Sequence, residues 1–125
     1  MSNKILVVED EEMLLRAIEK KLKMAGKTVI ACVSGKIAME ELKNAAQVPD
    51  VIWLDYYLKD MDGLGFMSFL KADERLANIP VVVVSNSATP DKVLNMKAMG
   101  VKRYILKADS RLDELVEIMD EVVGQ

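Results

Sequence analysis

The amino-acid sequence predicts an α/β protein with a doubly wound sheet of five parallel strands. Short apolar runs rich in valine and isoleucine recur along the 125-residue chain, and each is followed by a segment whose apolar residues have helical spacing. Two of these runs, Val51–Leu54 and Val81–Val84, contain no polar residue, which is typical of strands covered on both faces. Regular alternation of strand and helix signals predicts right-handed crossovers, and therefore a parallel sheet between two helical layers.

The N-terminal part of the chain contains two strand–helix units. Lys4–Val8 predicts the first strand, and the helix after it should end near Gly26. The apolar face of that helix comprises Leu14, Leu15, Ile18, Leu22 and Ala25. Thr28–Cys32 predicts the second strand, and the second helix should close at the turn of Pro49 and Asp50. Its apolar positions are Ile37, Ala38, Leu42 and Ala45.

The third unit starts with the strand Val51–Leu54, and the sequence Met61-Asp62-Gly63 turns from it into a helix. We expect Gly63 to supply a positive φ in that turn. We also expect Asp60 and Asp62 to be loop carboxylates that bind no metal directly. The apolar residues of the helix are Phe66, Met67 and Leu70.

The last two units complete the pattern. Pro80 precedes the fourth strand, and Thr89-Pro90 predicts the N-cap and first residue of a helix that ends at Gly100. Arg103–Leu106 predicts the fifth strand. The final helix should begin near Asp109 or Ser110 and bury a continuous apolar face. That face consists of Leu112, Leu115, Val116, Met119, Val122 and Val123.

Together these units predict one domain spanning residues 1–125. Among sheets of this size the strand order 2-1-3-4-5, that of flavodoxin-like (βα)5 folds, is the common one. Ligands of such sheets bind at the carboxyl edge, near the switch point between strands 1 and 3.

Composition excludes several functional classes. The absence of histidine excludes Ser-His and Cys-His catalysis, and a single cysteine, Cys32, excludes an internal disulfide and a multi-cysteine zinc site. A net charge of −3 argues against nucleic-acid binding. No apolar run approaches the length of a membrane span and the N-terminus does not read as a signal peptide, so we expect a cytoplasmic protein without a membrane partner.

Polar residues follow four of the five predicted strands, and the topology should bring them to one edge of the sheet. These residues are Glu9, Asp10, Asp55, Ser85 and Lys107. Clustered carboxylates repel one another in a partly desolvated cleft, and a site made only of acids suits Mg2+, which prefers oxygen ligands. A carboxylate beside such a metal can attack phosphorus, which makes Asp55 the candidate nucleophile.

Four short motifs occur in a specific order and spacing. They are VVED at Val7–Asp10, LD at Leu54–Asp55 followed by MDG at Met61–Gly63, VVVVS at Val81–Ser85, and the G-x-x-x-Y-x-x-K run of Gly100, Tyr104 and Lys107. With these motifs the chain resembles, along essentially its whole length, the receiver domain of two-component response regulators. The resemblance implies a phosphoacceptor that dephosphorylates itself rather than a turnover enzyme.

The resemblance also implies a role for each site residue. Asp55 would be the phosphoacceptor and a metal ligand, Asp10 a direct Mg2+ ligand, and Glu9 a ligand through water. Tyr57 would offer its backbone carbonyl to the metal.

Three further residues would act on the phosphoryl group and its signal. Ser85 and Lys107 would contact the phosphoryl group, and the orientation of Tyr104 would follow Ser85. The phosphoryl donor implied is a phosphohistidine on a histidine kinase or a histidine phosphotransfer protein. Phosphorylation would shift the surface formed by the fourth helix, fifth strand and fifth helix, which a downstream protein would bind.

The chain departs from the family at several positions. Ala108 replaces a proline that normally forms a cis peptide, and we expect a trans Lys107–Ala108 bond instead. Lys59 replaces another proline, and Asn86 and Tyr57 are bulkier or more polar than usual beside the phosphoryl pocket. From Asn86 and Tyr57 we expect an altered lifetime of the phosphorylated state.

Several alternatives stay open at this point. The chain could be a receiver excised from a longer regulator or hybrid kinase, a flavodoxin-like binding module without phosphotransfer, a degenerate receiver, or a phosphatase of the haloacid-dehalogenase type. The phosphatase would need an aspartate where Tyr57 stands. Taken alone, Asp55 could be a turn residue, Ser85 and Lys107 solvated loop residues, and Tyr104 a packing residue.

Overall fold

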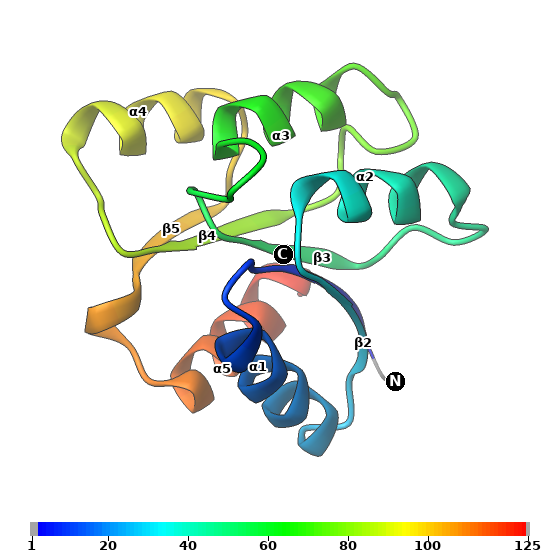
Figure 1. The fold of residues 1–125 in the computed structure, drawn as a ribbon, viewed down its shortest axis with the longest axis vertical. Helices are drawn as coiled ribbons and strands as arrows, with labels where there is room; N and C mark the ends of the chain where they lie inside the picture. Colours follow the sequence, from blue (N-terminus) through cyan, green and yellow to red (C-terminus); the bar gives the residue numbers. More distant parts are fainter. Residues whose placement is uncertain (1–2, 125) are drawn as a thin grey trace.

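The computed structural model describes residues 3–124 and confirms the predicted architecture. Five parallel strands form one sheet in the order β2-β1-β3-β4-β5 (Figure 1). The strands are β1 (Lys4–Val8), β2 (Thr28–Cys32), β3 (Val51–Leu54), β4 (Val81–Ser85) and β5 (Arg103–Leu106). The helices are α1 (Glu12–Met24), α2 (Gly35–Asn44), α3 (Gly63–Lys71), α4 (Pro90–Ala98), the short 3-10 helix η1 (Lys107–Asp109) and α5 (Leu112–Val123).

The helices form two layers. α2, α3 and α4 cover one face of the sheet, and α1 and α5 lie side by side on the other (Figure 1). Successive residues of a strand point to opposite faces, so β3 contributes Trp53 to the core beneath α1 and α5 and Leu54 to the core beneath the other three helices. This double burial explains the unbroken apolar runs of β3 and β4.

The register of the central strands determines where their polar successors lie. Val8 at the end of β1 pairs with Leu54 at the end of β3. The backbone N–H of Asp55 donates to the carbonyl of Val8 at 3.0 Å, and the N–H of Glu9 donates to the carbonyl of Cys32 at 3.0 Å. Both acidic residues therefore leave the sheet at the same level.

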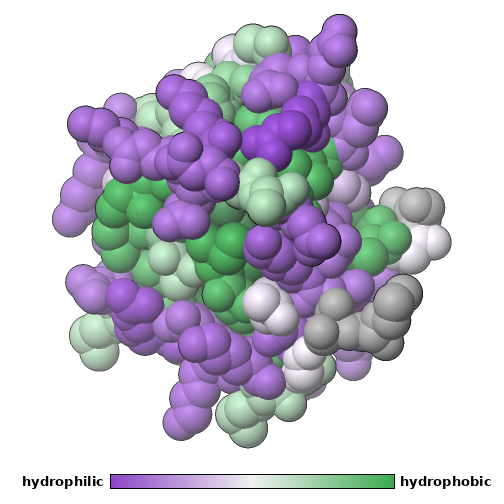
Figure 2. Space-filling view, turned by 90° about the vertical axis from the view of Figure 1, so that its right-hand side faces the viewer, coloured by the Kyte–Doolittle hydropathy of each residue, from purple (hydrophilic) through white to green (hydrophobic). Residues whose placement is uncertain are grey.

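Strand β2 is an edge strand, and its side chains are less completely covered. Val29, Ile30 and Ala31 are partly buried, with Ile30 packing on one core cluster and the other two on the opposite cluster. Figure 2 views the molecule from the β2 side and shows hydrophobic residues visible between larger hydrophilic areas. Cys32 is buried, as a small apolar residue would be, and burial raises the pKa of its thiol to about 12.

Three details of the predicted elements were wrong. The second helix, α2, ends at Asn44 rather than at the turn of Pro49 and Asp50, because the backbone of Ala45 is already extended. The last helix begins at Leu112 rather than at Asp109 or Ser110, because Lys107–Asp109 forms a 3-10 turn and Ser110 is extended. The backbone N–H of Arg111 donates to the Glu114 carboxylate at 3.1 Å, which fixes the later start.

Gly63 was expected to have a positive φ, and among the described residues only Gly26 and Gly100 do. Gly63 is the first residue of α3, and the side chain of Asp62 caps this helix by accepting the N–H of Gly65 at 2.9 Å. A β-carbon on Gly63 would lie 2.7 Å from Met96 Cε and 3.0 Å from Tyr56 Cδ2. Close packing, rather than backbone conformation, favours glycine here.

Two glycine substitutions should change stability in opposite directions. Gly26→Ala should lower the free energy of unfolding by about 1 kcal/mol, because φ at Gly26 is +84° and alanine is strained there although its β-carbon would meet no atom within 4 Å. Gly65→Ala, inside α3 with its nearest contact at an ordinary 3.6 Å, should raise it by about 0.5–1 kcal/mol. Urea unfolding of both variants checks the prediction, and shifts of the same sign would contradict it.

Candidate phosphorylation and metal site

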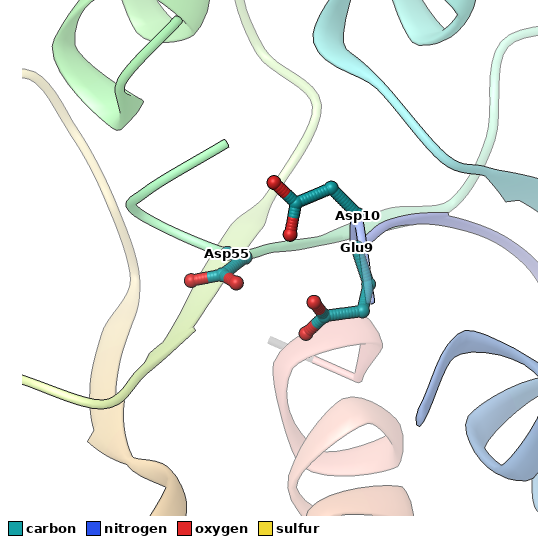
Figure 3. A group of neighbouring side chains, drawn as sticks. All are labelled: Glu9, Asp10 and Asp55. Carbon is teal, nitrogen blue, oxygen red and sulfur yellow. The ribbon is translucent and has the colours of Figure 1, made fainter. Parts of the chain in front are cut away.

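Three carboxylates meet at the carboxyl edge of the sheet. Glu9 and Asp10 follow β1, and Asp55 follows β3, so the switch point between these strands brings together residues 45 positions apart or more (Figure 3). Each carboxylate contributes one oxygen to the cluster, and these three oxygens lie within 4.8 Å of one another. The topology thus produces the acidic cluster expected from the sequence.

Two of the three carboxylates, those of Glu9 and Asp55, are buried and fully hydrogen-bonded. Glu9 is only 1% exposed and Asp55 only 7%. Lys107, which follows β5, donates from Nζ to Glu9 Oε1 at 2.8 Å and to Asp55 Oδ2 at 3.2 Å. The remaining oxygens accept backbone N–H groups, from Glu11 to Glu9 Oε2 at 3.1 Å and from Tyr57 to Asp55 Oδ1 at 3.3 Å. One ammonium group therefore bridges two buried acids.

Burial and neighbouring charges shift the pKa values of Asp55 and Lys107. Burial and the neighbouring charge of Glu9 raise the pKa of Asp55 from 3.8 to about 6, against the opposing effect of Lys107. Burial by itself would lower the pKa of Lys107, but its hydrogen bond to Glu9 and the charge of Asp55 raise the pKa above the ordinary value. Lys107 is thus a cation near neutral pH, while the cluster still carries an excess of negative charge.

The donor set fits Mg2+. All three side chains of the cluster offer hard oxygen ligands, and Asp10 is only partly buried, which leaves room for the waters that Mg2+ retains. One lysine cannot neutralise three clustered carboxylates, and a divalent cation would supply the missing charge. Glu9, Asp10 and Asp55 are the side chains that would hold it.

Ser85 and Tyr104 also lie at this edge. Ser85 ends β4, is fully buried, and its Oγ accepts the N–H of Ser87 at 3.4 Å. The Tyr104 hydroxyl donates to the carbonyl of Ser87 at 2.6 Å, and burial raises its pKa. That the orientation of Tyr104 follows Ser85 stays a prediction.

Asp60 and Asp62 have structural contacts. Asp60 accepts the N–H groups of Gly35 at 3.1 Å and Lys36 at 2.9 Å, at the N-terminus of α2. Asp62 caps α3. Neither belongs to the acidic cluster.

Lys92 and Tyr56 were missed from the sequence. Lys92 lies in the first turn of α4, with its Nζ 4.4 Å from the ring centroid of Tyr57 and 5.6 Å from that of Tyr56. A lysine in the first turn of a helix opposes the helix dipole, and this was the one sequence signal that could have drawn attention to it. Its contacts depend on three segments meeting in space, which no local pattern predicts.

Residues 5–120 match the family model of the response regulator receiver domain. The chain belongs to this family. Receiver domains act in two-component signal transduction, where they work with histidine kinases and bind Mg2+ at an acidic site. The acidic pocket of Glu9, Asp10 and Asp55 is consistent with such a site.

Similar proteins include both whole-length and partial matches. The chain is 27% identical over 124 residues to the polar-differentiation response regulator DivK of Brucella ovis. The matched region covers 99% of this chain and 98% of DivK. It is 29% identical over 103 residues to the sensor histidine kinase CheAY of Helicobacter pylori, but this covers 82% of this chain and spans only 13% of CheAY.

A solved structure also matches. The receiver domain of sensor histidine kinase PA1611 from Pseudomonas aeruginosa PAO1 superposes with a TM-score of 0.86 and 25% identity over all of both chains. It has a magnesium ion coordinated in its active site cleft.

One further expectation concerns the backbone. Residues 3–124 contain no cis peptide bond, so Lys107–Ala108 is trans as expected. None of the helices in that range is long and apolar enough to cross a membrane.

Replacing Asp55 should stabilise the metal-free protein at neutral pH. Because the pKa of Asp55 in the folded state lies above its unfolded value, the parent loses stability as pH rises from 3.8 to about 6. Asp55→Asn removes this loss and should raise the free energy of unfolding at pH 7.5 by about 1–2 kcal/mol, with the gain vanishing below about pH 4. Urea unfolding in a chelator at several pH values measures it.

The exposed Asp91→Asn, which alters no buried charge, serves as the control and should show no such pH dependence. An Asp55→Asn protein that is less stable than the parent at pH 7.5 would contradict the electrostatic account.

Proposed function

We propose that this domain accepts a phosphoryl group on Asp55 from a phosphohistidine of a partner protein, in a reaction that depends on Mg2+. The observation that carries the proposal is the geometry of Asp55, a buried carboxylate at the switch point that is flanked by two further acids and bridged to Glu9 by Lys107. Membership of the receiver family supports it.

The transfer requires a nucleophile and stabilisation of the phosphoryl oxygens. One Asp55 oxygen attacks phosphorus, and an O–P bond forms as the P–N bond to the partner's histidine breaks. The histidine nitrogen leaves with the electron pair of that bond and takes up a proton. Lys107 is positioned to neutralise charge on the phosphoryl oxygens, and the buried Ser85 hydroxyl would donate a hydrogen bond to one of them.

Asp55 and three other residues of the site would bind the metal. Asp10 and Asp55 would coordinate Mg2+ directly, Glu9 through water, and Tyr57 through its backbone carbonyl. The metal, when bound, neutralises phosphoryl charge and orients the group. Before the metal binds, the ion pairs of Lys107 with Glu9 and Asp55 hold these two carboxylates close to each other.

The partner must supply the histidine, since this chain contains none. A histidine kinase or a histidine phosphotransfer protein provides that chemistry. The resemblance to DivK spans nearly the whole of both chains, and the match to CheAY spans only a small part of a longer kinase. Either kind of partner is compatible with a receiver in these two settings.

The output surface would be the face formed by α4, β5 and α5. Leu94 on α4 is 67% exposed, which suits contact with a downstream protein. The signal would pass from Ser85 through Ser87 to the hydroxyl of Tyr104 on β5, which the hydrogen bonds between these residues support. Phosphorylation would shift the population of two arrangements of that face.

Treatment with a small phosphodonor and Mg2+ should add one phosphoryl group to the parent and none to Asp55→Asn. Intact mass and digestion locate the group, and Asp91→Asn, which is exposed and distant in sequence, should be modified like the parent. Modification of Asp55→Asn to the parental extent would overturn the proposed function.

Lys107→Ala should separate metal binding from chemistry. Without its ammonium the phosphoryl oxygens lose a charge partner, so the rate of phosphorylation should fall about 100-fold or more. Mg2+ binding should persist, because the carboxylates are intact and less neutralised. Fluorescence of Trp53, the only tryptophan, follows binding because Trp53 lies on β3, two residues before Asp55. An unchanged phosphorylation rate would remove Lys107 from the reaction.

A further inference from the structure

Lys92 joins three segments around the phosphorylation site. Its ammonium lies 4.4 Å from the ring centroid of Tyr57 and 5.6 Å from that of Tyr56, both in the β3–α3 loop. It also donates a hydrogen bond to Ser87 Oγ, in the β4–α4 loop, at 2.9 Å. These contacts offset the unfavourable position of a cation in the first turn of α4.

Both loops that Lys92 touches are tied directly to the site. The N–H of Tyr57 donates to Asp55 Oδ1 at 3.3 Å, and the N–H of Ser87 donates to Ser85 Oγ at 3.4 Å. A chain of contacts therefore runs from Asp55 through Tyr57, Lys92 and Ser87 to Ser85. This chain of contacts joins the Asp55 carboxylate to the Ser85 hydroxyl.

The Tyr57 ring needs such support to keep one position. Tyr57 is 51% exposed, so burial holds its ring only weakly. Its packing partner is the edge of Tyr56, at a centroid distance of 4.8 Å. Lys92 covers the ring from α4, and α4 is itself anchored by the fully buried Met96. Interaction with the Tyr57 hydroxyl raises the pKa of Lys92, which therefore stays charged.

We propose that Lys92 is a positioning residue that holds the Tyr57 ring beside Asp55 and slows hydrolysis of phosphorylated Asp55. This inference rests on the proposed function. In hydrolysis a water oxygen attacks phosphorus and the P–O bond to Asp55 breaks. Asp55 leaves as a carboxylate, and the water protons pass to the phosphate and to solvent. A ring held in one position beside Asp55 restricts the approach of that water.

The test compares dephosphorylation rates of loaded proteins. The parent, Lys92→Met, Tyr57→Leu and the double variant are loaded with a small phosphodonor and Mg2+, the donor is removed, and loss of the phosphoryl group is followed by intact mass. Each single variant should lose it about two- to fivefold faster, the equivalent of one exposed cation–π contact. The double variant should be no faster than the faster single one, because both changes release the same ring.

Lys97→Met is the matched control. Lys97 is an exposed lysine of the same helix, and its removal changes the net charge equally. It should decay like the parent. Parental decay of Lys92→Met, or single effects that multiply in the double variant, would overturn the proposal. So would a change in loading rate without a change in decay, since Lys92 would then only attract the anionic donor.

A second readout needs no phosphorylation. The ring current of Tyr57 should move the ε-methylene proton resonances of Lys92 upfield in the unmodified parent. Tyr57→Leu should remove most of this shift, leaving the smaller contribution of the more distant Tyr56 ring, while Lys97→Met retains it in full. An unshifted Lys92 resonance in the parent would overturn the contact itself. A parent that shows the shift but accepts no phosphoryl group would instead refute the proposed function and leave the contact standing.

Discussion

The bridge from Lys107 to Glu9 and Asp55 is the interaction on which the site depends. Two nearly buried carboxylates at one edge of a sheet repel each other, and an ammonium group 2.8 and 3.2 Å away lets them stay ionised and close. The partners are 98 and 52 residues apart in the chain, so only the complete sheet can assemble the bridge. Compensation remains partial, since the pKa of Asp55 is still raised to about 6. A divalent cation bound there would offset the remaining repulsion between the carboxylates.

The fold makes this arrangement possible by reversing the winding direction between β1 and β3. Helices on opposite faces leave the carboxyl edge uncovered at that point, and the pairing of Val8 with Leu54 places the following residues level with each other. The same register gives the site its support. Trp53 is locked beneath α1 and α5 and Leu54 beneath the other helices, so the strand that carries Asp55 is held from both sides.

Much of the structure and site could be predicted from the sequence, because the evidence was local or repeated. Unbroken valine runs identify β4, helical spacing identifies α1, and the polar residues after each strand identify the acidic site. The predicted start of α5 was wrong because competing local hydrogen bonds decide where a helix begins. Here a 3-10 turn forms at Lys107, and Glu114 caps the helix at Arg111. Gly63 was misread because its neighbours Met96 and Tyr56 come from other elements.

The sequence by itself determined the order of elements, the alternation that buries the sheet on both faces, and the residue types available at its carboxyl edge. These follow from periodicity and composition, which act over a few residues. Tertiary structure alone decided the distances among Glu9, Asp55 and Lys107, the elevated pKa of Asp55, and the position of Lys92 over Tyr57. Such properties depend on which distant segments come into contact and on how much water that contact excludes. Neither can be predicted from a local stretch of the sequence.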